Sequence, residues 1–326
     1  MDISFIVTVY NKDVALFNQC INSIIKLKNY QYEVIVIDDG SDSNLSAEYV
    51  KCIKKKNFKI RYYRKANEGV SLARNYGIEK ANGKYVYFVD ADDVLVLTEQ
   101  LLKSVIEEKD DVIITNVQQK RENNAIVFSL PVKTGEIDAE EILPQFVNNN
   151  LLNWSVAKFY LKQFLLHNKL EFNKKIIVGE DFFFVYKAIK KAKSIKYISQ
   201  TSYVYLYSDI TGTKRNLLNP KKVLENTYDV YLLKSKIMLK TNQDTVSNQK
   251  RLSSEIINSL YSIYRDLVLF NKSEANIYWI YIWDKLRQIR NNSPLGTKEL
   301  IKVIIVKHNL KYAVKLFNFL KKFDWA

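Results

Sequence analysis

The sequence predicts an α/β domain with a mainly parallel sheet, followed by a helical region. Three observations support this. Short apolar segments alternate with segments of helical periodicity over the first part of the chain, which is the pattern of a parallel sheet with crossover helices. The apolar segments are nearly continuous, as expected for strands covered on both faces. Beyond Lys214, long helical periodicities with few turn signals replace this alternation.

The first part of the chain contains four predicted strands with helices between them. The strands are Ile3–Val9, Glu33–Ile37, Lys59–Tyr63 and Tyr85–Asp90. The intervening segments repeat apolar residues at helical spacing. The predicted helices are Val14–Leu27, Leu45–Ile53 and Val70–Ala81. Polar clusters follow the strands, and the exits of parallel strands share one edge of the sheet, where ligands bind in open α/β folds.

Shorter elements follow the fourth strand. Further strands are predicted at Val112–Asn116, Ala125–Phe128, Ile195–Ser199 and Tyr203–Tyr207, and helices at Gln100–Glu108, Ala139–Asn148, Leu161–Asn168 and Phe182–Ala192. The segment Trp154–Tyr160 is predicted to be irregular. Helices are then expected near 220–240, 246–270, 274–291, 297–306 and 309–323. We therefore predict one domain over residues 1–215, with halves 1–115 and 116–215, and a helical domain over residues 216–326.

Composition and charge narrow the class of protein. The 326 residues are 47% hydrophobic, which allows a full core and excludes wholesale disorder. A net charge of +15 favours anionic partners such as nucleotide phosphates, nucleic acid or an acidic membrane surface. Two cysteines predict no disulfide framework. With no signal-peptide pattern and no apolar run near the roughly 18 residues of a spanning helix, we expect a cytoplasmic protein.

Three carboxylates end the fourth predicted strand. Asp90, Asp92 and Asp93 directly follow the apolar run Tyr85–Val89. Charged groups are costly in an apolar interior, so these residues mark the point where the strand leaves the core. Their oxygens suit Mg²⁺ or Mn²⁺, which usually hold substrate phosphates. An acidic turn that caps the next helix would give the same residues without a metal, so the motif needs support from the rest of the domain.

The other strand exits carry residues suited to a nucleotide. Tyr10 follows the first strand and can stack on a nucleobase. Asp38 and Asp39 end the second strand, where a carboxylate can accept hydrogen bonds from a base or from ribose hydroxyls. Asn67-Glu68-Gly69 opens the third helix, whose first N–H groups and Arg74 can face phosphates. Each feature is common alone, and together they predict a nucleotide-binding edge.

Four segments in this order resemble the family 2 glycosyltransferases. They are Ile6–Asn11, Val34–Ser41, Asn67–Asn75 and Phe88–Asp93. The resemblance covers about residues 1–115 and continues more loosely through Trp154–Tyr160 and Gly179-Glu180-Asp181 to near residue 212. It implies a GT-A fold, a nucleotide-sugar donor that is most often a UDP-sugar, a divalent metal ion, and inversion at the anomeric centre.

The resemblance also implies a set of donor-binding residues. They are Thr8, Tyr10, Asp39, Asn67, Gly69, Arg74, Asp90, Asp92 and Asp93. The first three are implied to contact the nucleoside, and the next three to approach the base, ribose or diphosphate. Asp90 and Asp92 are the implied Asp-x-Asp pair, with Asp90 nearer the ribose and Asp92 on the Mn²⁺ or Mg²⁺. Asp93 is implied to hold the sugar or a metal-bound water, and the register among these three carboxylates is open by one residue.

An inverting transfer needs one further carboxylate. The acceptor hydroxyl must lose a proton as it attacks, so a base is required on the face of the sugar opposite the nucleotide. Glu180-Asp181, just before a predicted helix, matches the acidic pair of the family. Asp181 is the implied base and Glu180 the alternative. Capping and the helix dipole alone also favour an acidic pair at a helix start.

The end of the chain is basic and amphipathic. Residues 298–326 contain seven lysines and two acids, and one helical face carries Leu310, Val314, Phe317 and Leu320. Such a helix can lie on an anionic membrane, here the inner face of the plasma membrane, or pack its apolar face on the domain. The membrane alternative fits a lipid-linked glycan acceptor in capsule, lipopolysaccharide or other cell-surface polysaccharide synthesis. The aromatic-rich helices can equally form a homodimer surface.

Two other functions fit parts of the sequence. A sugar nucleotidyltransferase on a related fold needs a glycine-rich basic loop after the first strand, and Thr8–Asp13 contains one lysine and no glycine. A basic nucleic-acid-binding protein explains the charge, but its phosphates would be repelled by the carboxylates after the fourth strand unless a metal is present. We therefore predict a metal-dependent hexosyl- or N-acetylhexosaminyltransferase with no nucleic-acid partner.

Overall fold

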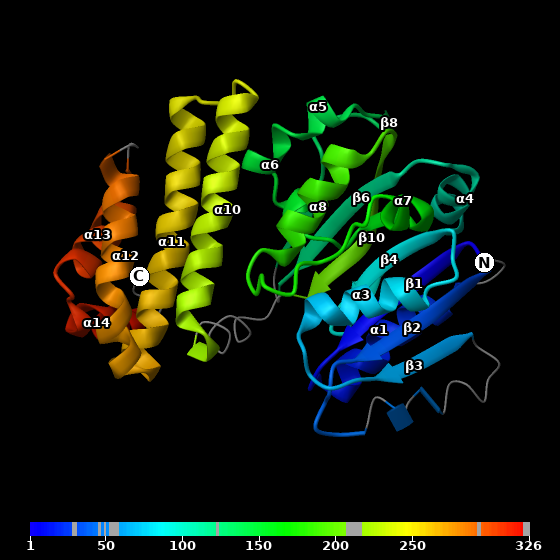
Figure 1. Ribbon diagram of the computed structural model, residues 1–326, viewed down its shortest axis with the longest axis horizontal. Helices are drawn as coiled ribbons and strands as arrows, with labels where there is room; N and C mark the ends of the chain where they lie inside the picture. Colours follow the sequence, from blue (N-terminus) through cyan, green and yellow to red (C-terminus); the bar gives the residue numbers. More distant parts are fainter. Residues whose placement is uncertain are drawn as a thin grey trace. The chain divides into compact units, whose positions relative to one another are not determined.

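The computed structural model describes residues 1–27, 31–44, 47–48, 50–51, 59–121, 124–206, 217–291 and 295–321. The chain divides into two compact units, residues 1–175 with 180–207, and residues 176–179 with 208–326. The first unit contains the sheet and the second is built from helices in the part described (Figure 1). The boundary predicted between residues 215 and 216 lies outside the described residues.

One large mixed sheet forms the first unit. Its strand order is β3-β2-β1-β4-β9-β6-β10-β5. The strands are β1 (Ile3–Val9), β2 (Tyr32–Asp38), β3 (Ile60–Arg64), β4 (Tyr85–Asp90), β5 (Val94–Leu95), β6 (Val112–Lys120), β9 (Lys158–Leu161) and β10 (Ile195–Leu206). Two further strands lie off this path, β7 (Ala125–Phe128) on β6 and β8 (Gly135–Glu136) on β10. The four longest pairings are parallel, which confirms the predicted fold class.

The register of β1 brings the polar strand exits together. β1 pairs in parallel with β2 on one side and β4 on the other, so Val9 lies opposite Asp38 and Thr8 lies opposite Asp90. All residues of β1 are buried, as expected for a strand covered on both faces. Three neighbouring strands therefore end at the same level, and the side chains that follow them lie at one edge of the sheet.

Helices cover this sheet (Figure 1). They are α1 (Val14–Ile25), α3 (Val70–Lys80), α4 (Glu99–Glu107), α5 (Ala139–Ile142), α6 (Gln145–Asn148), α7 (Lys162–His167) and α8 (Glu180–Lys191). The α3 helix packs closely on β1, since a Cβ atom at Gly77 would lie 2.3 Å from the Cγ2 atom of Ile6. Most of the predicted helix Leu45–Ile53 lies outside the described residues.

The segment before α7 differs from the prediction. Lys158–Leu161, of which Lys158–Tyr160 were expected to be irregular, form β9, which runs antiparallel between β4 and β6. Asn150–Asn153 form a short 3₁₀ helix just before it. The first residue of β9 is a buried lysine, Lys158, so the apolar pattern of the sequence does not indicate a strand here.

Two other elements have changed boundaries. The two strands predicted at Ile195–Ser199 and Tyr203–Tyr207 are one strand, β10, whose register against β6 shifts between Tyr197 and Tyr203. The helix predicted over Ala139–Asn148 is split into α5 and α6, with Pro144 between them. Proline lacks the N–H that a continuous helix needs and clashes with the preceding turn.

The second unit contains five helices among its described residues. They are α10 (Pro220–Lys240), α11 (Val246–Phe270), α12 (Lys272–Asn291), α13 (Thr297–Lys307) and α14 (Lys311–Lys321), close to the predicted ranges. The α11 helix is central, because it contacts each of the other four. Their shared core includes Leu260, Leu267, Leu286 and Val306. In the part of the chain described, none of the helices combines the length and apolarity needed to span a bilayer.

Candidate active site

The three carboxylates after β4 are held in different ways. Asp93 is 1% exposed, and its carboxylate accepts hydrogen bonds from the Tyr203 hydroxyl at 2.6 Å and the Leu206 N–H at 2.9 Å. Burial raises the pKa of Asp93 to about 8, and the charge of Asp90 adds to this rise. The side chains of Asp90 and Asp92 are 38% and 26% exposed. Asp93 therefore fixes the turn against β10, whereas Asp90 and Asp92 remain partly exposed at the edge of the sheet.

Asp92 already has a cation beside it. The ammonium of Lys12, three residues after β1, forms an ion pair with its carboxylate. Among the described residues, no group of three or more His, Cys, Asp or Glu side chains converges on a point where a metal ion fits. Mg²⁺ is typically bound by one or two carboxylates together with water and substrate phosphates. Asp90 and Asp92 fit such an ion, held jointly with a phosphate-bearing ligand.

The exit of β2 holds the loop before α3. The Asp39 carboxylate accepts hydrogen bonds from the N–H groups of Glu68 at 3.1 Å and Gly69 at 2.8 Å, and from the Lys65 ammonium at 2.8 Å. Gly69 is the N-cap of α3 and has a φ of 94°, in the left-handed region that favours glycine. Asp39 thus joins β2 to the start of α3, with its side chain largely buried.

The other residues predicted on the nucleoside side lie along this same edge. Thr8 is buried within β1, opposite Asp90. Tyr10 follows β1 and is 46% exposed, so a planar ligand can reach its ring. Asn67 is exposed, and its N–H lies close to Gly40, where a Cβ atom would approach to 2.7 Å. The exits of β1 and β2 and the loop before α3 therefore form one continuous surface.

Arg74 joins the strand exits to the acidic pair of α8. Its guanidinium is 4% exposed, and it donates to Asp90 Oδ1 at 3.0 Å and to Asp181 Oδ1 at 2.6 Å. Glu180 lies 3.7 Å away. The guanidinium also lies over the ring of Phe172, 5.2 Å from its centroid. Burial lowers the pKa of Arg74, but the three carboxylates raise it by more, so Arg74 stays charged.

Asp181 lies in the first turn of α8 and is held from a second side. The Ser155 hydroxyl donates to its Oδ1 atom at 2.9 Å. Burial raises the pKa of the Asp181 carboxyl above its usual value and the charge of Asp90 adds to the rise, whereas the Arg74 guanidinium and the hydrogen bonds from Ser155 oppose it. The side chain remains 16% exposed. An ionised carboxylate with charged and hydrogen-bonding partners can accept a proton from a hydroxyl group.

The residues at this edge of the sheet lie within a match to a known protein family. The family model "Glycosyl transferase family 2" matches residues 4–171, which is more than half of the chain and includes β1 to β4 and their exits. This chain is a family 2 glycosyltransferase. The match confirms the family that the sequence motifs resemble.

Named relatives agree with the family. The chain is 34% identical over 128 residues to glycosyltransferase GlyA of Streptococcus pneumoniae, which is 39% of this chain and 18% of that protein. It is 25% identical over 241 residues to the putative glycosyltransferase EpsH of Bacillus subtilis, or 71% of this chain and 69% of the relative. Matches to three Rickettsia glycosyltransferases cover 17% to 23% of those proteins, so this chain corresponds to only a part of them.

Solved structures extend the likeness to both units. The glycosyltransferase resembles residues 1–349 of S. aureus TarS in complex with UDP-GlcNAc, with a TM-score of 0.61 and 22% identity over 89% of this chain and 81% of that one. The complex of TarS with UDP gives a TM-score of 0.59 and 18% identity over 96% and 92%. This likeness shows the fold alone, and it confirms a GT-A fold followed by a helical region.

Three residues of the glycosyltransferase site were missed from the sequence. Lys12 pairs with Asp92, Lys65 binds Asp39, and Ser155 binds Asp181. Lys12 and Lys65 lie next to recognised motifs, and this proximity is the only signal that could have singled them out. Ser155 lies in the stretch predicted to be irregular, and no pattern near it points to α8.

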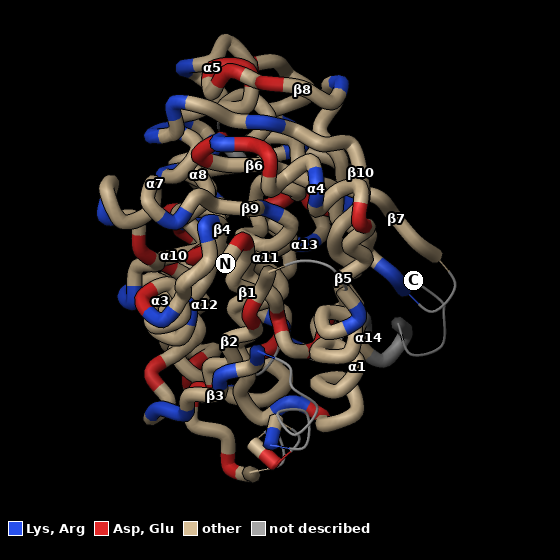
Figure 2. The backbone as a smooth tube through the Cα atoms, turned by 90° about the vertical axis from the view of Figure 1, so that its right-hand side faces the viewer, with Lys and Arg blue, Asp and Glu red and all other residues tan. Residues whose placement is uncertain are grey.

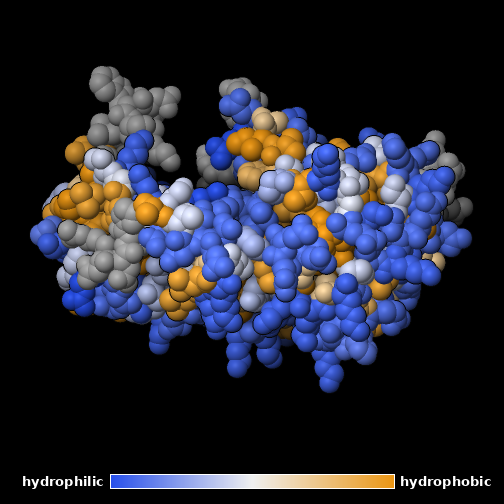
Figure 3. Space-filling view, turned by 90° about the horizontal axis from the view of Figure 1, so that it is seen from above, coloured by the Kyte–Doolittle hydropathy of each residue, from blue (hydrophilic) through white to orange (hydrophobic). Residues whose placement is uncertain are grey.

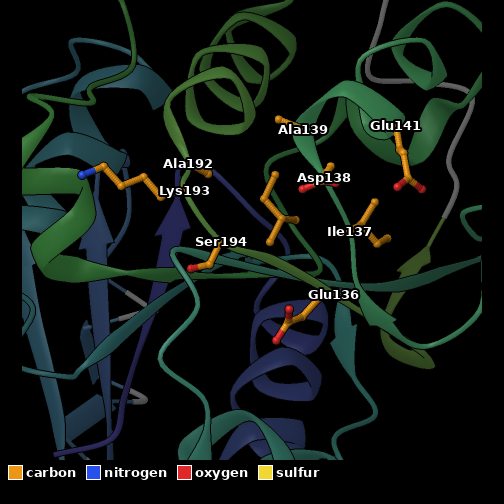
Figure 4. Close-up of a pocket in the computed structure, with 9 residues that line it drawn as sticks. Glu136, Ile137, Asp138, Ala139, Glu141, Ala192, Lys193 and Ser194 are labelled. Carbon is orange, nitrogen blue, oxygen red and sulfur yellow. The ribbon is translucent and has the colours of Figure 1, made fainter.

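A separate pocket lies at the other end of β10. It is lined by Glu136–Ala139, Glu141 and Ala192–Ile195, with the acidic side chains along one side (Figure 4). These residues precede or begin β10, whereas the candidate active site lies where the strands end. None of the predicted site residues lines this pocket.

Proposed function

We propose that this glycosyltransferase transfers a sugar from a UDP-sugar to a glycan hydroxyl with inversion, and that it needs Mn²⁺ or Mg²⁺. The observation that carries the proposal is the position of Arg74, which binds Asp90 and Asp181 at once. A single displacement requires the leaving group and the base to lie on opposite sides of one anomeric carbon. One guanidinium links Asp90 on the donor side to Asp181 on the acceptor side, which supports placing both carboxylates around the same anomeric carbon.

On the donor side, we assign the nucleoside to Thr8, Tyr10 and Asp39. We assign Asn67 and Gly69, at the exposed start of α3, to the ribose or diphosphate. We expect Arg74 to orient Asp90 through their hydrogen bond, because its guanidinium is too buried to bind freely to a ligand. A metal ion, when bound at Asp90 and Asp92, would offset the charge that builds on the leaving diphosphate. The TarS complex with UDP-GlcNAc supports a uridine donor.

On the acceptor side, we assign the general base to Asp181. Arg74 and Ser155 both stabilise its ionised form and fix its orientation. Glu180 remains the alternative, because its carboxylate lies 3.7 Å from the same guanidinium. The proton of the acceptor hydroxyl passes to this carboxylate as the new glycosidic bond forms and the bond to the diphosphate breaks.

Thermal stability with added nucleotides tests the donor assignment. Unfolding would be followed with UDP, a panel of UDP-sugars that includes UDP-GlcNAc, and either Mn²⁺ or EDTA. A ligand that binds only the folded protein adds about 2.7 kcal/mol at a hundredfold excess over its dissociation constant. We expect stabilisation by UDP in Mn²⁺ and not in EDTA. If neither UDP nor the GDP, CMP and dTDP donors raise the thermal stability, the proposal is contradicted.

We further propose that the acceptor is a lipid-linked glycan and that the second unit contacts an anionic membrane. From residue 208 onward the sequence has 21 Lys and Arg against 10 Asp and Glu, whereas residues 1–207 have 29 against 25. Figure 2 shows Lys and Arg interspersed with Asp and Glu along the first unit. The excess positive charge is therefore concentrated in the helical unit, where it favours anionic lipid headgroups.

The α13 helix offers apolar residues for such a contact. Leu300, Ile301 and Ile304 are about 40% exposed on one side of the helix, and Lys298 and Lys307 flank them. Figure 3 shows hydrophobic residues at the surface of this unit, at the left. This arrangement is typical of helices that lie in the membrane interface.

The residues predicted to share one apolar face of the last helix differ in their exposure to solvent. Leu310 is exposed just before α14, and Val314 is buried in the core. Packing on the domain, the alternative to membrane contact, therefore holds for Val314. The side chains of Phe317 and Leu320 lie outside the described residues. The predicted homodimer through these helices stays a prediction.

Liposome sedimentation tests the membrane proposal. We expect the protein to sediment with vesicles that contain phosphatidylglycerol and not with pure phosphatidylcholine, since the attraction is electrostatic and apolar together. Replacing Ile301 and Ile304 by Ser should weaken sedimentation about tenfold, because two apolar side chains that would be buried in the membrane are lost. Ile126→Ser with Val127→Ser is the matched control, since these residues are similarly exposed on β7. Equal sedimentation of both double variants would contradict the assignment to α13.

A further inference from the structure

Lys158 is fully buried at the start of β9, and the mechanism above does not use it. Its ammonium donates hydrogen bonds to the carbonyls of Leu151 at 2.9 Å, Trp154 at 2.7 Å and Val156 at 3.2 Å. All three acceptors belong to the segment that precedes the strand, so this segment wraps around the lysine that follows it. An ammonium has three N–H donors and no acceptor, and these bonds use all three.

The wrapped segment, residues 151–156, also reaches the candidate base. Ser155 lies between two of the bound carbonyls, and its hydroxyl donates to Asp181 Oδ1 at 2.9 Å. The carbonyl of Ser155 accepts a hydrogen bond from the Tyr160 hydroxyl at 3.1 Å. Ala157 joins the segment to β9 with a φ of 56°, in the left-handed region. The backbone around Ser155 is therefore held in an unusual path by side chains of β9.

The same segment carries an aromatic side chain into a small cluster. The Trp154 ring lies 5.0 Å from the Phe128 ring and 6.1 Å from the Tyr205 ring, between centroids. The N–H of Leu206, next to Tyr205, binds Asp93. The ammonium of Lys158 thus holds a segment that contacts β7 and the end of β10 through Trp154 and Asp181 through Ser155.

Burying a charged lysine side chain costs free energy, which indicates that the Lys158 ammonium has a specific role. Burial lowers the pKa of Lys158 to about 7, and the charge of Asp181 opposes this fall. A methionine of similar length would fill the space without the cost of burying a charge. It would, however, leave three carbonyls without their donor, and buried carbonyls without partners are unfavourable.

We propose that Lys158 is a positioning residue, whose ammonium holds residues 151–156 so that Ser155 keeps Asp181 oriented and ionised. Lys158 does not touch the reacting atoms. It acts through two hydrogen-bonded steps, from the ammonium to the backbone of the segment and from Ser155 to the carboxylate. This inference rests on the proposed function, in which Asp181 is the base.

The test compares Lys158→Met with Lys162→Met by hydrogen–deuterium exchange. Lys162 is a matched control, because its ammonium also donates to a backbone carbonyl, that of Ala81, but lies outside the wrapped segment. We expect exchange in residues 150–157 to rise about tenfold in Lys158→Met and to stay unchanged in Lys162→Met. Unchanged exchange in Lys158→Met, or an equal rise throughout the first unit, would overturn the inference.

A second readout follows the base itself, with UDP-GlcNAc as the donor probe. We expect Lys158→Met to lower kcat about tenfold and to leave KM for the donor unchanged, since only Asp181 is disturbed. The acid limb of the pH profile should move to higher pH, because the hydrogen bonds from Ser155 lower the pKa of Asp181 and are lost when the segment is released. An acid limb that stays in place would contradict the route through Ser155.

A double-mutant cycle separates this route from a general loss of stability. If Lys158 acts through Ser155, the losses in kcat from Lys158→Met and Ser155→Ala should not add in the double variant. Additive losses would contradict the inference. Absence of nucleotide binding by the wild-type protein would instead reject the proposed function, and the exchange comparison would still decide whether Lys158 holds the segment.

Discussion

Replacing Asp181 by Asn is expected to lower kcat by about 10²- to 10⁴-fold, the usual contribution of a general base. The amide has nearly the same shape and can still accept hydrogen bonds from Arg74 and Ser155 through its oxygen. It cannot take the proton of the acceptor hydroxyl. Donor affinity should stay within about twofold, because the loss is confined to the transition state. Steady-state rates with varied donor, together with a UDP titration, measure both quantities.

Glu180→Gln is the matched control for this prediction. It neutralises the neighbouring residue of the same helix turn, whose carboxylate lies 3.7 Å from Arg74 rather than 2.6 Å. We expect kcat to fall less than about tenfold in this variant. If Glu180→Gln shows the large loss and Asp181→Asn the small one, Glu180 is the base and the assignment made here is reversed.

Replacing Asp92 by Asn is expected to remove the metal dependence of donor binding. A neutral amide is a weaker ligand for Mn²⁺ or Mg²⁺ than a carboxylate. Calorimetric titration with UDP in Mn²⁺ should show a loss of at least about tenfold in affinity, or 1.4 kcal/mol. In EDTA the variant and the wild-type protein should bind UDP equally weakly.

Asp93→Asn should act mainly on stability, because its carboxylate is buried against Tyr203 and Leu206.

Lys12 provides the sharpest control for the metal. Its ammonium forms an ion pair with the Asp92 carboxylate. If Mn²⁺ binds to this carboxylate in place of the ammonium, Lys12→Gln should make Mn²⁺ bind more tightly. The opposite result has a clear meaning. If the wild-type protein binds UDP equally well in EDTA, and Lys12→Gln abolishes that binding, Lys12 rather than a metal ion supplies the positive charge at the diphosphate.

The donor half could be predicted from the sequence because its signals are local. The strands β1, β2 and β4 are largely apolar, β3 is marked by its tyrosines between Arg61 and Arg64, and each motif lies at or shortly after the end of its strand. Parallel strands joined by helices end at one edge of the sheet, so the sequence predicts that these motifs lie together, and the structure adds the register that sets Thr8 opposite Asp90. The helices α10 to α14 were also predictable, because helical periodicity is a local property as well.

The acceptor half could not be predicted in the same way because it depends on distant pairing. β9 enters the sheet between β4 and β6, although it follows both in the chain. Only this insertion places Ser155 beside Asp181 and buries Lys158. The burial of Arg74 could not be predicted either, since a charged residue on a helix usually lies at the surface. It is explained only by the positions of Asp90 and Asp181, which both accept hydrogen bonds from the guanidinium.

The anomeric configuration of the first product tests the central claim most directly. Proton NMR would follow the enzyme with an α-linked UDP-sugar that stabilises it in Mn²⁺, with water or a glycan as the acceptor. A single displacement with Asp181 as base predicts that the β-configured sugar appears first, before mutarotation. If the α-configured product appears first, configuration is retained, and the arrangement of donor and base around Arg74 proposed here is contradicted.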